Sequence, residues 1–153
     1  MRPFFQKTFS TFFNSRRVAG NFAQELAGIF MGLAFLRKHY AQHRAIKLEN
    51  VFIHEGKAVL VDQAVPLLFE KYFSDEFDPD EEEADPRFDV KNFPPEFFND
   101  PDAYFFPAEV WSAGCILFEL ANQTHPFAAE ADSTKDLVKC IKKGLHQKPN
   151  RDK

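Results

Sequence analysis

The sequence has few cysteines, no excess of basic residues and no long apolar run. Cys115 and Cys140 are too few for a disulfide framework and are typical of a reducing compartment. The net charge of −4 provides no general basic field for nucleic acid or an anionic membrane. The longest uncharged apolar run, residues 27–36, is about half as long as the roughly 20 residues of a membrane-spanning helix. We therefore expect no nucleic-acid partner, no membrane span and a cytoplasmic location.

Phenylalanine, in contrast, is abundant. The chain contains 20 phenylalanines but only three tyrosines and one tryptophan, within an apolar content of 44% that is normal for a globular protein. Its 153 residues are enough for one domain with a core. We expect part of this phenylalanine, including the pairs Phe97–Phe98 and Phe105–Phe106, to lie on a surface that faces a partner.

The first 20 residues form a basic, amphipathic segment without an acid. Five of its phenylalanines fall on one helical face: Phe4, Phe5, Phe9, Phe12 and Phe13. We expect a helix that packs on the next one. The alternative is a mitochondrial presequence, which has the same composition and would change the location.

Apolar periodicity predicts three helices and one β-hairpin, an α+β fold that is mainly α. The helices are expected at 21–38, 107–122 and 133–143, and the hairpin strands at 51–53 and 58–61. Proline and acidic residues interrupt the pattern over residues 66–106, which are expected to form a long irregular loop. The predicted domain covers residues 21–148, and residues 149–153 form a tail.

Five short motifs follow one another along these elements. They are HRAIKLEN at 43–50, DQA at 62–64, PPE at 94–96, EVWSAGCILFEL at 109–120 and HPF at 125–127. In this order and spacing they closely resemble the C-terminal lobe of protein kinases, with its H-R-D-x-x-x-x-N, D-F-G, A-P-E, D-x-W-S-x-G and Pro-Phe motifs. Lys47, two places after the aspartate position, resembles the lysine of serine/threonine-type protein kinases. The resemblance covers residues 21–144.

The resemblance implies that the catalytic site has been lost. In the family, the aspartate of H-R-D accepts the proton of the substrate hydroxyl, and Ala45 occupies that position here. A methyl group accepts no proton, so no catalytic set is intact. What remains of the motif is His43, Arg44, Ala45, Lys47 and Asn50.

The resemblance also assigns the remaining motif positions. Asn50 and Asp62 correspond to the ligands of the nucleotide's Mg²⁺ and are expected to be vestigial, because Gln63–Ala64 replace the Phe and Gly of D-F-G. Lys47 corresponds to the lysine that steadies the transferred phosphate. Four further residues match structural positions of the family: Glu96, Glu109, Trp111 and Gly114.

Other parts of the family pattern have no counterpart in this sequence. No G-x-G-x-x-G loop, strand lysine or helix glutamate precedes residue 21, and the last helices of the lobe do not follow residue 144. We therefore expect a truncated C-terminal lobe without the N-terminal lobe. Glu96, which pairs with an arginine in the family, is expected to find another partner or to lie in water.

These observations predict a catalytically inactive, pseudokinase-like domain that acts as a protein-interaction module and binds no cofactor. Its partner would be a kinase, a kinase substrate or a second copy of the chain. One alternative is part of a serine/threonine kinase completed by another chain or by missing sequence, with Mg-ATP at Asn50 and Asp62. A second alternative is a gene fragment without a function.

Two further patterns suggest sites but favour simpler explanations. The acidic run 75–85 lies in the loop that corresponds to the activation segment, directly after Ser74. We expect a solvated loop, the alternatives being a substitute for activation-loop phosphate or a docking site for a basic partner. His39 and His43 have a spacing that would suit a metal on a helix, but no third ligand stands out, so we expect no zinc site.

Overall fold

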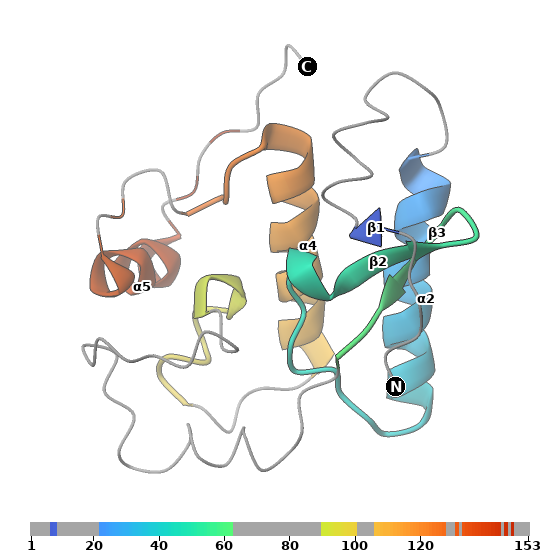
Figure 1. The fold of residues 1–153 in the computed structure, drawn as a ribbon. Helices are drawn as coiled ribbons and strands as arrows, with labels where there is room; N and C mark the ends of the chain where they lie inside the picture. Colours follow the sequence, from blue (N-terminus) through green and yellow to red (C-terminus); the bar gives the residue numbers. More distant parts are fainter. Residues whose placement is uncertain are drawn as a thin grey trace. The chain divides into compact units, whose positions relative to one another are not determined.

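The structure is a computed structural model that describes residues 7–8, 22–62, 90–100, 106–127, 131, 133–144, 146 and 148. The chain divides into two compact units, which we call the N-terminal unit (Met1–Gln63) and the C-terminal unit (Ala64–Lys153). Figure 1 shows the elements of both units along the chain. Among the helices in these described stretches, none is long and apolar enough to cross a membrane.

In the N-terminal unit, helix α2 spans Phe22–Lys38, as the apolar periodicity predicted. Leu26, Ile29 and Leu33 are buried, and their spacing places them on one face of the helix. Arg37 and Lys38 lie in the last turn, where positive charge is favourable near the helix C-terminus. The opposite side of α2 carries exposed apolar residues.

The predicted hairpin is present as strands β2 (Val51–His54) and β3 (Lys57–Leu60), which pair antiparallel with Val51 opposite Leu60. The two turn residues, Glu55 and Gly56, both have positive φ angles, 50° and 75°. This combination is the one that a two-residue hairpin turn matching the strand twist requires. The sequence His-Glu-Gly-Lys therefore forms a tight two-residue turn, and the predicted hairpin is confirmed.

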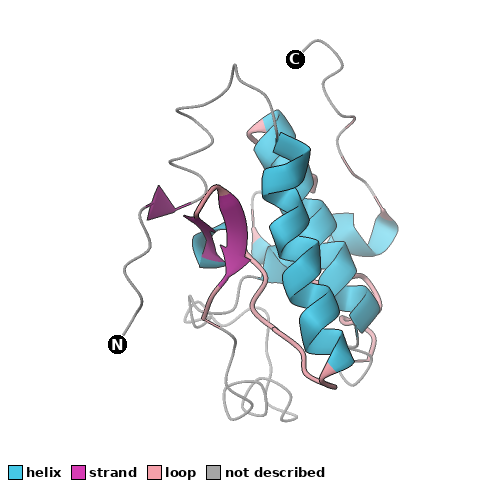
Figure 2. Cartoon of the chain, turned by 90° about the vertical axis from the view of Figure 1, so that its right-hand side faces the viewer, coloured by secondary structure: helices cyan, strands magenta, loops and turns pink. Residues whose placement is uncertain are grey.

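Helix α2 packs directly on strand β3, and Figure 2 shows the hairpin beside the helix. The approach is closest at Gly28, where a Cβ atom would lie 3.0 Å from the backbone carbonyl carbon of Ala58 and closer still to its oxygen. Val51, Ile53 and Ala58 are buried, which follows the alternation of side chains along strands. The absence of a side chain at Gly28 thus sets how closely helix and sheet can pack.

The N-terminal segment differs in part from the expected helix. Lys7–Thr8 form a short strand, β1, which pairs antiparallel with β2, with Lys7 opposite Ile53 and Thr8 opposite Phe52. A helix therefore does not run through these two residues. The other residues of the 1–20 segment lie outside the described part of the chain, as does the tail at 149–153.

In the C-terminal unit, helix α4 spans Phe106–Asn122 and the short 3₁₀ helix η2 spans Val90–Asn92. The Ser112 hydroxyl lies 2.7 Å from the carbonyl oxygen of Asn92, to which it donates, and 3.0 Å from that of Ala108. This contact ties η2 to α4. Apart from η2, residues 90–100 contain no helix or strand, as expected for the long loop.

Helix α4 is less buried than its apolar sequence suggested. Ala113 and Ile116 are fully buried, but Val110 is 43% exposed and Gly114 is also exposed. An apolar residue is not necessarily an inside residue, because polar side chains do not suffice to cover a protein surface. Helix α4 therefore has an exposed side, although most of its residues are apolar.

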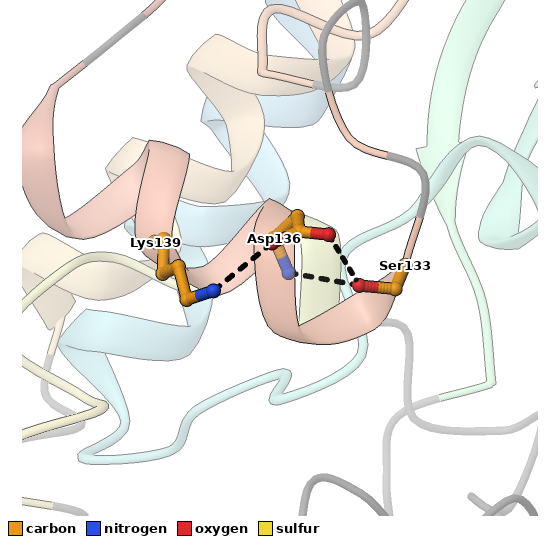
Figure 3. Close-up of polar contacts among 3 residues, drawn as sticks. All are labelled: Ser133, Asp136 and Lys139. Carbon is orange, nitrogen blue, oxygen red and sulfur yellow. Dashed lines mark hydrogen bonds and ion pairs between the residues drawn. The ribbon is translucent and has the colours of Figure 1, made fainter.

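Helix α5 spans Thr134–Lys143 and has well-defined ends. Ser133 is the N-cap and accepts from the backbone N–H of Asp136 (Figure 3). Gly144 closes the helix in the left-handed conformation with φ 65°. Cys140 and Ile141 on its inner face join Cys115 and Phe127 in one core cluster.

The phenylalanine pair at 97–98 does not lie on an exposed surface. Phe97 is buried and Phe98 packs against the core cluster of Cys115, Phe127, Cys140 and Ile141. The rings of the pair meet edge to face, with 5.5 Å between centroids. The prediction that Phe97–Phe98 form part of a partner surface is therefore wrong. Phe105 lies outside the described residues.

Candidate functional site

The loop at 41–50 leads from α2 to strand β2 and ends in the 3₁₀ helix η1 (Leu48–Asn50). Asn50, at the end of this loop, is buried and its side-chain Nδ2 donates to the carbonyl oxygen of Ala45 at 2.8 Å. The backbone carbonyl of Asn50 in turn accepts from the N–H of Val61 at 2.9 Å. The loop is thus tied to itself and to the end of the hairpin.

Ala45 lies within this loop and is half-buried. Its carbonyl oxygen is held by Asn50, and its side chain is a methyl group. The position can therefore support the loop backbone but cannot accept a proton from a hydroxyl substrate. Arg44, next to it, has a φ of 63°, and its Nε donates to Gln42 Oε1 at 2.9 Å.

His43 is buried, with 3% of its surface exposed. Burial lowers the pKa of its imidazole from 6.5 to about 4, although the backbone at Val61 and the negative charge of Asp62 act in the opposite direction. The ring is therefore neutral at pH 7. This makes His43 a packing and hydrogen-bonding residue and not an acid or base poised for neutral pH.

A pocket of about 330 Å³ lies in the N-terminal unit between α2 and β3. Gly28, Gly32 and Leu60 contribute to its apolar lining, and His43 and Asp62 are its ionisable residues. Two of the predicted motif residues thus line this pocket: His43 from the loop and Asp62 from the segment that follows β3.

The two predicted metal positions, Asn50 and Asp62, lie at the same end of the hairpin. The pairing of Val51 with Leu60 and the hydrogen bond from Val61 to Asn50 bring them there. The Asn50 Nδ2 donates to the Ala45 carbonyl oxygen, so Oδ1 is the atom of this side chain that suits a metal. Asp62 is an exposed carboxylate. Amide and carboxylate oxygens are ligand types that Mg²⁺ accepts when phosphates and water complete its shell, so the donor chemistry fits.

The two histidines whose spacing suggested a metal site, His39 and His43, lie in different environments. His39 is exposed at the end of α2, where its ring lies 4.4 Å from that of Phe35, whereas His43 is buried in the loop. In the described stretches of the chain, no three His, Cys, Asp or Glu side chains are grouped as metal ligands.

The structural motif residues of the C-terminal unit occupy contrasting environments. Glu109 is fully buried in the first turn of α4, whereas the Glu96 side chain is exposed to water, one of its two expected outcomes. The Trp111 ring stacks on Phe127 of the HPF motif, with 5.6 Å between centroids and 10° between planes. Gly114 is exposed on α4, and Gln63–Ala64 lie outside the described residues.

A buried polar cluster in this unit was not foreseen from the sequence. His125 Nδ1 accepts from the N–H of Phe127 at 3.3 Å, so Nε2 carries the proton and lies 3.3 Å from Asn92 Oδ1. Burial, reinforced by the positive charge of Lys91, lowers the His125 pKa from 6.5 to about 4. The partners are 33 residues apart, and no local pattern marks such a pair.

The comparisons with known proteins agree with the motifs. A family model described as "Protein kinase domain" matches residues 10–152. The mouse serine/threonine-protein kinase Nek3 is 32% identical over 129 residues, which cover 79% of this chain and 22% of Nek3. The chain thus spans about a fifth of the length of this curated relative. The expected α+β class is confirmed, and the chain belongs to the protein kinase family.

Proposed function

We propose that this chain is a non-catalytic member of the protein kinase family that acts by binding another protein. The observation that carries the proposal is Ala45, which replaces the proton-accepting aspartate of the catalytic loop. Loss of a general base typically slows a reaction by about 10²–10⁴-fold. The chain order of α2, the loop, the hairpin, α4 and α5 supports assigning the described elements to the C-terminal lobe of the family.

The hydrogen bonds around Ala45 support a structural role for the loop. Asn50 is still bonded to the Ala45 carbonyl, and Val61 is still bonded to Asn50. Substituting alanine for aspartate removes the proton acceptor but leaves these backbone contacts in place. The loop then serves to connect α2 to the hairpin, and a cytoplasmic location accords with the free thiols of Cys115 and Cys140.

The exposed side of α2 supports the interaction role. Phe30, Met31 and Phe35 are 41%, 65% and 62% exposed. With Ala27 and Ala34, which are also exposed, they lie at the i, i+3, i+4, i+7 and i+8 positions of one helical face. Contiguous apolar surface of this kind commonly marks a site of protein interaction.

The exposed apolar side of α2 predicts that the folded chain self-associates or binds an apolar dye. Wild type is expected to enhance the fluorescence of anilinonaphthalene sulfonate or to sediment as an oligomer. Met31→Gln/Phe35→Gln should remove most of either signal, because it takes two large side chains from this surface. Val110→Gln, at an exposed position of α4, is the matched control and should keep it. A folded wild-type monomer without dye enhancement would count against the interaction role.

An active serine/threonine kinase is the competing function, and it would require Mg-ATP. When bound, the nucleotide would supply the phosphoryl group, and Asn50 Oδ1 and the Asp62 carboxylate would hold the metal. The substrate hydroxyl would still lack an acceptor for its proton in this loop, because Ala45 offers none. We therefore propose that no cofactor is needed for the chain's role.

A further inference from the structure

Helix α5 presents four lysines on one face. Lys135, Lys139, Lys142 and Lys143 are all exposed, and their spacing of i, i+4, i+7 and i+8 places them within an arc of about 100°. We call this the lysine face. The other side of the helix is fixed in the core through Cys140 and Ile141, so the lysine face is held toward solvent.

The only acid on α5 is already engaged. The Asp136 carboxylate accepts from the Ser133 hydroxyl at 2.8 Å and from Lys139 Nζ at 3.1 Å (Figure 3). Both hydrogen bonds lower the pKa of the Asp136 carboxyl group, and the bond from Ser133 has the larger effect. The carboxylate therefore stays ionised. Four lysines against one aspartate leave the helix with a net positive charge, although the whole chain carries −4.

We propose that the lysine face binds a short acidic segment of a protein partner. The inference rests on the proposed interaction role and gives the partner its chemistry. From Lys135 to Lys143 the helix rises about 12 Å, a length that about four extended residues span. The expected ligand is therefore an acidic stretch of four to five residues in extended conformation.

Two other anionic partners fit the structure less well. An amphipathic helix that lies on a membrane inserts its apolar face, but Ile141 and Cys140 on that face of α5 are buried in the protein. Nucleic-acid surfaces commonly combine basic with aromatic side chains, and residues 134–143 contain no aromatic residue.

The test measures fluorescence anisotropy of a labelled peptide with five consecutive glutamates, against the same peptide with glutamines. Wild type should bind only the glutamate peptide, with an affinity that falls as salt is added. Lys142→Gln/Lys143→Gln should weaken binding about tenfold, at the upper range for two exposed ion pairs. Lys38→Gln/Lys57→Gln removes the same charge from exposed positions of the N-terminal unit and should change binding less than about twofold.

A second variant separates lost binding from lost folding. Lys143→Ala places the residue of highest helix propensity at an exposed position of α5, so the thermal midpoint should change little while peptide binding weakens. Equal losses in the Lys38/Lys57 control would overturn the proposal. Tighter binding to phosphatidylserine vesicles or to a DNA duplex than to the peptide would also overturn it.

Failure of the lysine-face proposal and failure of the proposed function give different experimental results. If the glutamate peptide does not bind but the apolar side of α2 behaves as expected, the lysine face is not the docking site and the interaction role stands. If the chain transfers phosphate, the non-catalytic role fails, and peptide binding by the lysine face is unaffected.

Discussion

Gly28→Ala is expected to lower the free energy of unfolding of the N-terminal unit by about 2 kcal/mol. The new methyl group would overlap the backbone carbonyl of Ala58, and a backbone atom cannot move aside as the end of a flexible side chain can. Overpacking typically costs about 1–3 kcal/mol, and more where backbone must shift, while alanine regains about 1 kcal/mol of helix propensity. Urea unfolding followed by circular dichroism measures the difference.

Gly32→Ala is the matched control on the same helix. Its Cβ would lie 3.5 Å from Leu60 Cδ1, an ordinary contact with a side chain. We expect this variant to be as stable as wild type or more stable by up to about 1 kcal/mol, because only the gain in helix propensity remains. Equal stability of the two variants would show that α2 does not approach β3 as closely as the structure places it.

Stability is expected to fall as the pH is lowered from 6.5 to 4. Burial holds the folded pKa of both His43 and His125 at about 4, below the ordinary value of 6.5. The unfolded chain therefore binds more protons in this range, so the stabilisation is complete above pH 6.5 and is lost as the pH falls toward 4. A shift of this size corresponds to up to about 3 kcal/mol for each histidine. Denaturant unfolding at a series of pH values measures the loss.

Single variants assign this pH dependence. His125→Gln removes one titrating ring. The free energy of unfolding of this variant should therefore change less between pH 6.5 and 4 than that of wild type, whatever its value at pH 7. His54→Gln is the control, because the His54 side chain is 58% exposed. An identical pH dependence for wild type and His125→Gln would show that His125 is not held neutral by burial.

Local sequence patterns accounted for the elements better than for their contacts. The bounds of α2 and α5 and both hairpin strands were predictable to within a residue or two, because apolar spacing, Ser133 and Gly144 act over one or two turns. The pairing of β1 with β2 was not predictable, since Lys7–Thr8 lie over 40 residues from their partners and show no alternation of their own.

The same distinction applies to the candidate site. The resemblance to protein kinases implied that Asn50 and Asp62 belong together, and the hairpin register explains why they lie at one end. The hydrogen bonds of Ser112 and His125 to Asn92 connect residues that are 20 and 33 positions apart in the sequence. No local sequence pattern predicts such contacts. The burial of Phe97 likewise depends on neighbours that composition alone does not specify.

The most direct test of the non-catalytic role is phosphate transfer from γ-labelled ATP, with Mg²⁺, to serine- and threonine-containing peptides. Wild type and Ala45→Asp should both stay at the background set by Ala45→Asp/Asp62→Asn. An aspartate alone does not replace the Phe and Gly whose places Gln63–Ala64 occupy. Transfer by wild type, or robust transfer by Ala45→Asp that disappears with Asp62→Asn, would contradict the account.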